Sequence, residues 1–332
     1  MKLIIQIPCY NEEAQLPETL AALPRSLPGI DEIEILVVDD GSSDGTAEVA
    51  RQAGATYLLR LPVHLGLAHA FSAGLDAALK LGADLIVNTD ADHQYPGDQI
   101  PILIAPILRG EADMVIGDRA PHRSQHFGFL KRVLQRIGSW AVRQLSGTSV
   151  PDAASGFRAF SRRAALRLNV LTKFTYTLET IIQAGKKQIP LTHVPIRTNA
   201  ERRPSRLFGS MLTYVRRSAV TMVRIYAMYE PLRVFSTLGA LGILTGIAIG
   251  LRFLYHYLSA GGEGHIQSLI LAAVLLIVGV QTILIGLVAD LIAANRALIE
   301  DTLLRVREVE LRLGEGPDAR LTSLEHPAEP GA

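Results

Sequence analysis

Two long runs without a charged residue divide this chain. Residues 234–251 (VFSTLGALGILTGIAIGL) and 266–289 (IQSLILAAVLLIVGVQTILIGLVA) contain no Asp, Glu, Lys or Arg. Each run is about long enough to cross a hydrocarbon core roughly 30 Å thick. A long buried core helix is the alternative, but two such runs after a complete α/β pattern favour membrane-spanning helices over about 234–258 and 266–291.

The charges that flank these runs predict their orientation. The linker SAGGEGHIQ between the runs has no Lys or Arg, whereas arginines lie outside both runs. These arginines are Arg224, Arg233, Arg296, Arg305 and Arg307. The positive-inside rule therefore places the amino-terminal domain and both termini in the cytoplasm, with a multi-pass anchor in the cell membrane. Gly242, Gly246 and Gly250 recur at every fourth position, which favours close packing against the second span or another subunit.

These patterns divide the chain into five parts. Residues 1–206 form an α/β domain, 207–233 are amphipathic juxtamembrane helices, and 234–294 hold the two transmembrane helices. Residues 295–314 continue as a cytoplasmic helix with a short heptad-like spacing. The polar end, 315–332, is predicted to be disordered.

The first two hundred residues alternate apolar runs with helical patterns. The apolar runs are KLIIQIP, EIEILVVDD, TYLLRL, ADLIVNTD and ADMVIGD. Such alternation predicts βαβ units in a doubly wound, mostly parallel sheet, and continuous apolar strands are expected when helices cover both faces. Residues 126–147 place apolar side chains on one helical face, so this helix packs on the sheet or lies on an anionic surface.

Charge and cysteine content exclude some classes of protein. Lys and Arg number 33 against 32 Asp and Glu, a net charge of +1, so nothing indicates a nucleic-acid partner. Cys9 is the only cysteine, which excludes an intrachain disulfide and suits a reducing compartment.

Two predicted strands end in paired acids. Asp39 and Asp40 end the run ILVVDD, just before the turn GSSDGT, and Asp90 and Asp92 follow LIVN. Ligands of open parallel sheets bind at the carboxyl ends of the strands. Residues two apart on an extended chain project to one side, so Asp90 and Asp92 can share Mg²⁺ or Mn²⁺ with substrate phosphates. A turn or helix-cap role is the alternative for Asp92, and a turn role is the alternative for Asp39 and Asp40.

Other nucleotide chemistries lack their motifs. CYNEEAQ after the first strand has no glycine-rich dinucleotide fingerprint, and GSSDGT lacks the lysine of a P-loop. Hydride transfer and ATP hydrolysis are therefore disfavoured. His93 is a candidate general base, although a loop histidine is more often a bystander.

An ordered set of motifs resembles a known family. In chain order they are PCYNEE, VVDDGSSDGT, NTDADHQYP, IGDR and DAASGFRAFSR. Together they resemble the inverting family 2 glycosyltransferases with a GT-A-like fold, and in particular the polyprenyl-phosphate (dolichyl-phosphate-type) enzymes. The resemblance covers residues 3–206 and extends to the two-span carboxyl-terminal anchor of the branch that makes lipid-linked sugars.

The resemblance implies a nucleotide-sugar site on the amino-terminal strands. It places Pro8, Tyr10, Glu12 and Asp39 around the base and ribose. Asp40 is expected near the ribose or diphosphate.

The resemblance also implies catalytic and metal-binding roles at the second pair of acids. Asp90, Asp92 and Gln94 are expected to hold Mg²⁺ or Mn²⁺ with the diphosphate. Arg119, from IGDR, is expected to meet the acceptor phosphate. Lys131 and Arg132 are further candidates for the acceptor phosphate, although Gln135 stands where the family has a serine.

Two further motifs are expected near the donor. Ser155, Gly156 and Arg158 match the family's loop beside the donor sugar, Arg158 being counted with the catalytic residues. The ERRPSR segment, containing Arg202, Arg203, Ser205 and Arg206, resembles a shortened basic motif that closes over the diphosphate, with Arg203 and Arg206 expected to bind the donor. His64 and Leu67 depart from the asparagine and basic residue of many relatives.

The predicted function is transfer of a hexose from a nucleotide-diphosphate sugar to polyprenyl phosphate, either dolichyl or undecaprenyl, with inversion. LPVHLGLA favours a UDP-hexose over GDP-mannose by resemblance. Similar enzymes form homo-oligomers, including tetramers. One alternative is a nucleotide-sugar-binding scaffold without turnover. Another is a polysaccharide synthase-like transferase, although the only tryptophan, Trp140, is preceded by Ser139 and not by the arginine of a Q-x-x-R-W motif.

Overall fold

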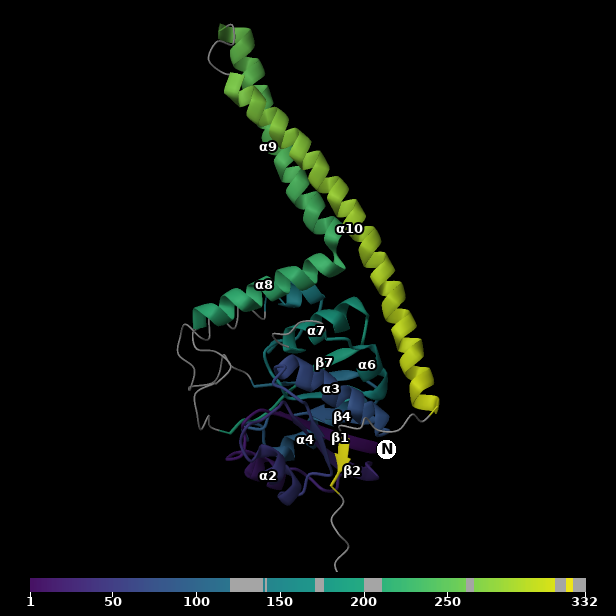
Figure 1. Cartoon of the computed structure of the whole chain (residues 1–332). Coiled ribbons are helices and arrows are strands. Elements are labelled where there is room, and N and C mark those ends of the chain that lie inside the picture. The colour runs from purple at the N-terminus through teal and green to yellow at the C-terminus, as the bar shows by residue number, and fades with distance from the viewer. Residues whose placement is uncertain are drawn as a thin grey trace, which may run out of the picture. The chain divides into compact units, whose positions relative to one another are not determined.

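The computed structural model describes residues 1–119, 140, 142–170, 176–199, 211–260, 266–313 and 321–324. The chain forms two compact units, shown in Figure 1. One consists of Met1–Met222 with Leu304–Ala332, and the other is Val223–Leu303. Each unit is described by itself.

The first unit is built on a mixed sheet with eight strands among the described residues. They are β1 (Lys2–Cys9), β2 (Glu32–Asp39), β3 (Tyr57–Arg60), β4 (Leu85–Asn88), β5 (Met114–Asp118), β6 (Arg158–Ser161), β7 (Leu191–Pro195) and β8 (Leu321–Ser323). Their order is β7-β5-β6-β4-β1-β2-β3-β8. The first five strands confirm the predicted alternation. β1 pairs in parallel with β2 and β4, β2 with β3, and β5 with β7.

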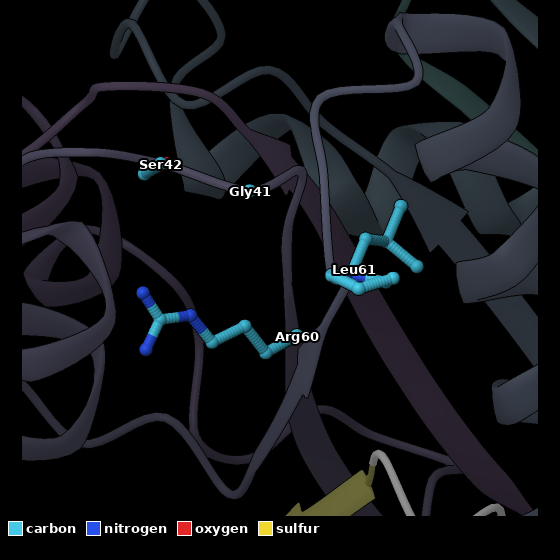
Figure 2. A pocket seen from close by; sticks show the side chains of 5 residues that line it. Gly41, Ser42, Arg60 and Leu61 are labelled. Carbon is cyan, nitrogen blue, oxygen red and sulfur yellow. The ribbon is translucent and has the colours of Figure 1, made fainter.

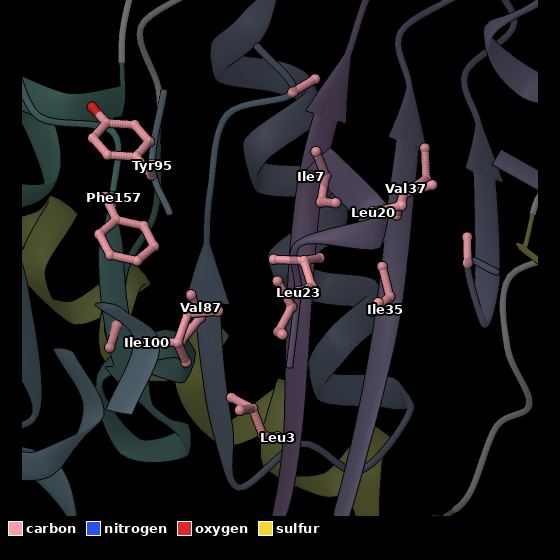
Figure 3. Packing of buried hydrophobic residues seen from close by; sticks show 14 of the residues in the cluster. Leu3, Ile7, Leu20, Leu23, Ile35, Val37, Val87, Tyr95, Ile100 and Phe157 are labelled. Atoms are coloured by element: carbon pink, nitrogen blue, oxygen red, sulfur yellow. The ribbon is translucent and has the colours of Figure 1, made fainter. Parts of the chain in front are cut away.

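Helices cover both faces of this sheet, as the continuous apolar strands predict. They are α1 (Leu16–Ala21), α2 (Thr46–Gln52), α3 (Leu67–Lys80), η1 (Gly97–Gln99), α4 (Ile100–Leu108), α6 (Arg162–Arg167) and α7 (Tyr176–Lys186). Figure 3 shows the core on one face, where Ile7, Val37 and Val87 of the strands pack with Leu20 of α1 and Ile100 of α4. α3 packs on the other face, against β1 and β2.

β6 is an element that the sequence patterns do not predict. It lies between β4 and β5 and runs antiparallel to both. Its four residues, RAFS, are too few for a recognisable alternation and begin with a fully buried arginine, Arg158. The pairing Asn88↔Arg158 brings the preceding segment, 152–157, beside the end of β4.

Within the segment 315–332, which the sequence predicts to be disordered, the structure describes residues 321–324, and these are ordered. Residues 321–323 form β8, which pairs antiparallel with the edge strand β3. Leu324 packs against the core, and its N–H donates to the carbonyl of Thr56 at 2.8 Å. Pairing with the edge of β3 and the burial of Leu324 therefore order this short segment, although the residues around it in the sequence are mostly polar. The predicted helix over 126–147 lies largely outside the described residues, and its described end, 142–146, is helical.

The second unit is a helical hairpin. α8 (Met211–Tyr229) leads to α9 (Pro231–Ala260), and α10 (Ile266–Leu313) is one unbroken helix of 48 residues. α9 and α10 are long and apolar enough to cross a membrane. A Cβ on Gly239 would lie 2.6 Å from the carbonyl oxygen of Gly279, and one on Gly246 would lie 3.0 Å from that of Ala272. Small residues therefore allow the two helices to pack closely.

Candidate active site

Two predicted site residues meet at the carboxyl end of β4. Asp90 follows this strand, and Gly156 lies in the segment that precedes β6. A Cβ at Gly156 would lie 2.7 Å from Oδ2 and 2.8 Å from Oδ1 of Asp90. Such distances are closer than any real contact of a methyl group, so only glycine leaves room for this carboxylate. The structure thus brings Asp90 and the SGFR motif into direct contact, although 66 positions separate them in the sequence.

A buried polar layer fixes this contact. Asn88, the last residue of β4, donates through Nδ2 to the carbonyl of Gly156 and to the hydroxyl of Tyr176, both at 2.9 Å. Its Oδ1 accepts from Nε2 of Gln6 at 2.9 Å. The Tyr176 ring stacks on Phe71 with centroids 3.9 Å apart. These residues were not predicted from the sequence. A polar residue that ends an apolar strand, as Asn88 does in LIVN, could have indicated a buried hydrogen-bonding role.

The Asp90 carboxyl has an unusual charge balance. Burial, followed by the negative charge of Asp92, raises its pKa to about 7, while the positive charges of Arg119 and Arg158 oppose the rise. A carboxylate that burial and a like charge destabilise gains most from a nearby cation. Ionised Asp90 and Asp92 together therefore favour a positive ligand between them and a bound anion.

The donors here fit a hard divalent ion. Asp92 and Gln94 are both half-buried, and Asp92 accepts from the Gln94 N–H at 3.1 Å through Oδ1. In the described part of the chain, no three or more His, Cys, Asp or Glu side chains gather as a complete metal site. Mg²⁺ commonly binds through one or two carboxylates with substrate phosphates completing its shell. The oxygen donors of Asp90, Asp92 and Gln94 fit that pattern.

The loop that carries Asp92 and Gln94 is held in a strained shape. His93 has φ of +56°, in the left-handed region that few side chains adopt. Asn199 donates from its Nδ2 to the His93 carbonyl at 2.8 Å and from its backbone N–H to the Gln94 carbonyl at 2.9 Å. The structure thus gives His93 a backbone role in shaping this loop.

Arg119 lies beside the acids but is bound by a partner that the sequence analysis missed. Its Nε donates to Oδ2 of Asp152 at 2.7 Å and its NH2 group to Oδ1 at 3.0 Å. Asp152 is fully buried, and 14% of the Arg119 side chain is exposed. Such a bidentate pair orients the guanidinium. Asp152 opens the motif DAASGFR, which is the signal that could have identified it.

Arg158 and Ser155, which the resemblance places beside the donor sugar, lie in the interior of the protein. Both residues are fully buried. The Arg158 guanidinium donates to the carbonyls of Ser155, Thr177 and Ala153 and to the hydroxyl of Thr180. With these donors used internally, Arg158 fixes the 153–156 segment that supports Asp90.

The acids that end β2 are engaged within the protein. Asp40 is 2% exposed, and its carboxylate accepts from the N–H groups of Leu65 and Gly66, both at 2.8 Å. His64 Nδ1 lies 2.8 Å from the same carboxylate. Asp40 therefore fixes the loop after β3.

The other predicted donor residues surround this strand end. Tyr10 is 41% exposed, and its ring stacks on His64 with centroids 3.8 Å apart. Pro8 is buried within β1. Glu12 is half-buried, and its N–H donates to Oγ1 of Thr46 at 2.8 Å. Asp39 is fully buried and accepts from the Ser42 N–H at 2.9 Å through Oδ1.

A pocket opens beside Asp39. It has a volume of about 310 Å³, and its lining residues are Gly41, Ser42, Arg60, Leu61 and Pro62. Figure 2 shows the Arg60 side chain extending from its backbone on the side of Gly41 and Ser42. The sequence analysis did not single out Arg60. The remaining predicted residues, Lys131, Arg132, Arg203 and Arg206, lie outside the described residues.

Two regions of the chain match known protein families. Residues 4–168 match the model of glycosyl transferase family 2, and residues 230–294 match the GtrB C-terminal hairpin. An uncharacterized glycosyltransferase of Mycobacterium bovis is 34% identical over 182 residues, covering 54% of this chain and 78% of the relative. Undecaprenyl-phosphate mannosyltransferase of Micrococcus luteus is 32% identical over 166 residues, covering 48% of this chain and 66% of the relative.

The fold is also shared with a solved structure. Glucosyl-3-phosphoglycerate synthase from Mycobacterium tuberculosis, in complex with Mn²⁺ and UDP-glucose, superposes with a TM-score of 0.52 at 22% identity, covering 67% of this chain and 78% of that one. The sheet and its acid-lined edge thus define a GT-A-like glycosyltransferase with an apolar helical hairpin. The chain belongs to glycosyl transferase family 2.

Proposed function

We propose that this membrane glycosyltransferase moves a hexose from a nucleotide-diphosphate sugar to polyprenyl phosphate, with inversion at the anomeric carbon. The observation that carries the proposal is the Asp90 carboxylate, held against Gly156 at the sheet edge and raised in pKa beside Asp92. Such a site suits a cation and a diphosphate. The apolar hairpin and the similarity to an undecaprenyl-phosphate mannosyltransferase support a lipid phosphate acceptor.

The donor would bind across the ends of β2 and β4. Asp39 and Tyr10 would face the nucleoside, as the family resemblance implies. Asp90, Asp92 and Gln94 would hold Mg²⁺ or Mn²⁺, which would neutralise charge developing on the leaving diphosphate. The Asn88 layer and Asn199 would keep the acids and their loop in place without rearrangement during the reaction.

The acceptor needs orientation more than activation. A phosphate monoester has a second pKa of about 6, so it is largely dianionic at pH 7. One of its oxygens attacks the anomeric carbon as the bond to the nucleotide diphosphate breaks, and the electron pair of that bond leaves with the diphosphate. Arg119, oriented by Asp152, is our candidate for aligning the phosphate. Lys131 and Arg132 remain predicted contacts from the resemblance.

The hairpin would hold the active site near its lipid substrate. From the flanking arginines we propose that the catalytic domain and both termini are cytoplasmic. We also propose a homo-oligomer, such as the tetramers of similar enzymes. Glycosylation mapping of the 259–267 linker against the termini would test the orientation.

A transfer assay tests the proposed function. Full-length protein in nanodiscs would be incubated with radiolabelled UDP- or GDP-hexose, undecaprenyl phosphate and Mn²⁺, and labelled lipid would be extracted. The proposal predicts formation of a labelled lipid phosphate sugar that EDTA abolishes. Nucleotide binding without turnover would instead indicate a binding scaffold, and transfer only to another acceptor would indicate a polysaccharide synthase-like enzyme.

A further inference from the structure

One face of α10 carries exposed aliphatic side chains beyond the charge-free run, which ends at Ala289. They recur seven positions apart at Ile292, Ile299, Val306 and Leu313, and each is between 55% and 72% exposed. Val309, between the last two, is 54% exposed. These five residues form the α10 seam. A contiguous apolar face of this kind is rarely left uncovered on a soluble surface, so the seam points to a binding partner.

The intramolecular contacts of α10 lie on other faces of the helix. Among the described residues, Arg307 Nη1 donates to Asn169 Oδ1 at 2.8 Å. Nearer the start of the helix, Gly279 packs on α9, where a Cβ would lie 2.6 Å from the Ile243 side chain. Each successive residue turns about 100° around the helix, so Arg307 points well away from Val306. The folding of a single chain therefore leaves the seam exposed.

Lipid does not cover the seam of a helix that leaves the membrane. α10 is one unbroken helix from Ile266 to Leu313, as Figure 1 shows. At 1.5 Å per residue, Leu313 lies about 36 Å beyond Ala289 along the helix axis. A continuous helix that crosses the bilayer carries this end into water, so a protein surface is the partner that the seam fits.

The seven-residue spacing is that of a coiled coil. A strict seven-residue repeat keeps apolar side chains on one seam when two helices wind around each other, with core positions named a and d. Ile292, Ile299 and Val306 occupy position a, and β-branched residues there favour two parallel strands. Polar Asn295 and Thr302 occupy two of the d positions, which makes the pair weaker than an all-apolar one.

The residues beside the seam are self-complementary in a parallel pair. There, a residue at position g of one helix meets the residue five positions later, at position e, on the other helix. Leu298 would meet Leu303 of the second copy, and both are exposed. Arg305 would meet Glu310 of the second copy, whose side chain is 34% exposed although it pairs with Lys80. Apolar side chains thus face each other, and so do opposite charges, on both sides of the pair.

We propose that the α10 seam binds the seam of a second copy of this chain in a parallel, two-stranded coiled coil. All copies insert into the membrane in the same direction, so a helix that continues from a span can meet its copy only in parallel. The contact gives the proposed homo-oligomer a defined surface outside the membrane. It does not depend on hexose transfer, so the two proposals are tested separately.

Cysteine cross-linking tests this contact. Cys9, the only cysteine, is buried, so an introduced thiol is the accessible one. Full-length Ile299→Cys and Val306→Cys proteins in proteoliposomes would be oxidised with copper phenanthroline and resolved by non-reducing electrophoresis. Glu308→Cys is the matched control, because Glu308 is exposed on the same turn but points away from the seam. Since a disulfide needs Cα atoms roughly 6 Å apart, most of the seam variants should form linked dimers, and Glu308→Cys should stay monomeric.

A charge exchange tests the alignment of the two helices. Arg305→Glu would place glutamates opposite each other at both flanks, so we expect the dissociation constant of the dimer to rise about tenfold. The double variant Arg305→Glu with Glu310→Arg restores opposite charges and should restore the dimer. Mass photometry of the solubilised full-length protein would measure both. Failure of the double variant to recover the dimer would overturn the proposed alignment.

The outcomes separate this surface from other contacts. Equal cross-linking of Val306→Cys and Glu308→Cys would indicate random collision, and this result or the absence of links in both would overturn the α10 contact. A stable oligomer without links in Val306→Cys would overturn this surface alone and leave the proposed homo-oligomer to other contacts. A monomeric wild-type protein would overturn both, while the transfer assay would still test the proposed function.

Discussion

The two acid pairs at the ends of β2 and β4 look alike in sequence but differ in structure. The Asp40 carboxylate accepts from two backbone N–H groups and lies beside His64. Asp90 lies against the backbone of Gly156 with Asp92 as a charged neighbour, and its pKa rises to about 7. The first pair includes an acid whose charge stabilises a loop. In the second pair, burial and the charge of Asp92 destabilise the ionised form of Asp90, and a bound cation can offset this.

The difference shows what distinguishes a structural acid from a ligand-binding one. Backbone N–H donors stabilise a carboxylate in place and tie a neighbouring segment to it. A carboxylate that is buried beside a like charge, as Asp90 is, is stabilised in its ionised form by an external cation. Neighbouring chain segments decide between these states, because the donors to Asp40 come from residues 65 and 66 and the surroundings of Asp90 from residue 156.

The largest expected effect comes from filling the space beside Asp90. Gly156→Ala would place a methyl group 2.7 Å from the carboxylate, so Asp90 must move. A displacement of about 1 Å in an active site can cost roughly 100-fold in rate, and we expect a loss of that size in the transfer assay.

Gly250→Ala is a control for this variant, because its new methyl group meets nothing closer than 3.9 Å. It should retain the wild-type rate. A Gly156→Ala protein with near-normal turnover would show that the position of Asp90 is unimportant.

A second prediction concerns the structural acid. Asp40→Ala removes the acceptor for the Leu65 and Gly66 N–H groups, so the free energy of unfolding should fall by about 1–3 kcal/mol. Loosening the loop should also weaken UDP binding several-fold while Mn²⁺ affinity stays unchanged. Chemical denaturation and titration would measure these effects. Loss of Mn²⁺ binding in Asp40→Ala would break the contrast between the two strand ends.

A third prediction concerns the dependence of stability on pH. The Asp90 pKa is about 7 in the folded protein and 3.8 as its ordinary value. Folding therefore binds a proton between these values, and the associated stability, present below about pH 4, is lost as pH rises through 7. In metal-free protein the Tm of wild type should fall across this window relative to Asp90→Asn. Parallel Tm profiles for the two proteins would contradict the raised pKa.

Sequence patterns identified the parts of the fold that carry repeated local signals. The strands β1 to β5 are predictable from apolar runs flanked by turns, and the hairpin from two charge-free segments. β6 and β8 could not be predicted in this way, because each is short and is held in place by pairing with distant strands.

The residues of the candidate site also divide into those marked by local motifs and those fixed by contacts with distant segments. Asp90, Asp92 and Gly156 follow from their motifs, and the structure brings Asp90 and Gly156 together. Tyr176 and Asn199 act through contacts with segments distant in sequence, so no local pattern marks them. Asp152 also acts on a distant segment, and only its place at the start of DAASGFR marks it. Arg158 was expected beside the donor sugar from the resemblance of its motif, whereas its burial among carbonyls depends on segments that the motif does not contain.

Mn²⁺ binding separates the two acid pairs. Electron paramagnetic resonance would follow titration of Mn²⁺ into wild type, Asp92→Asn and Asp40→Ala in the presence of UDP. We expect a bound Mn²⁺ signal in wild type and Asp40→Ala, and its loss in Asp92→Asn. Undiminished Mn²⁺ binding by Asp92→Asn would contradict a cation site at the end of β4.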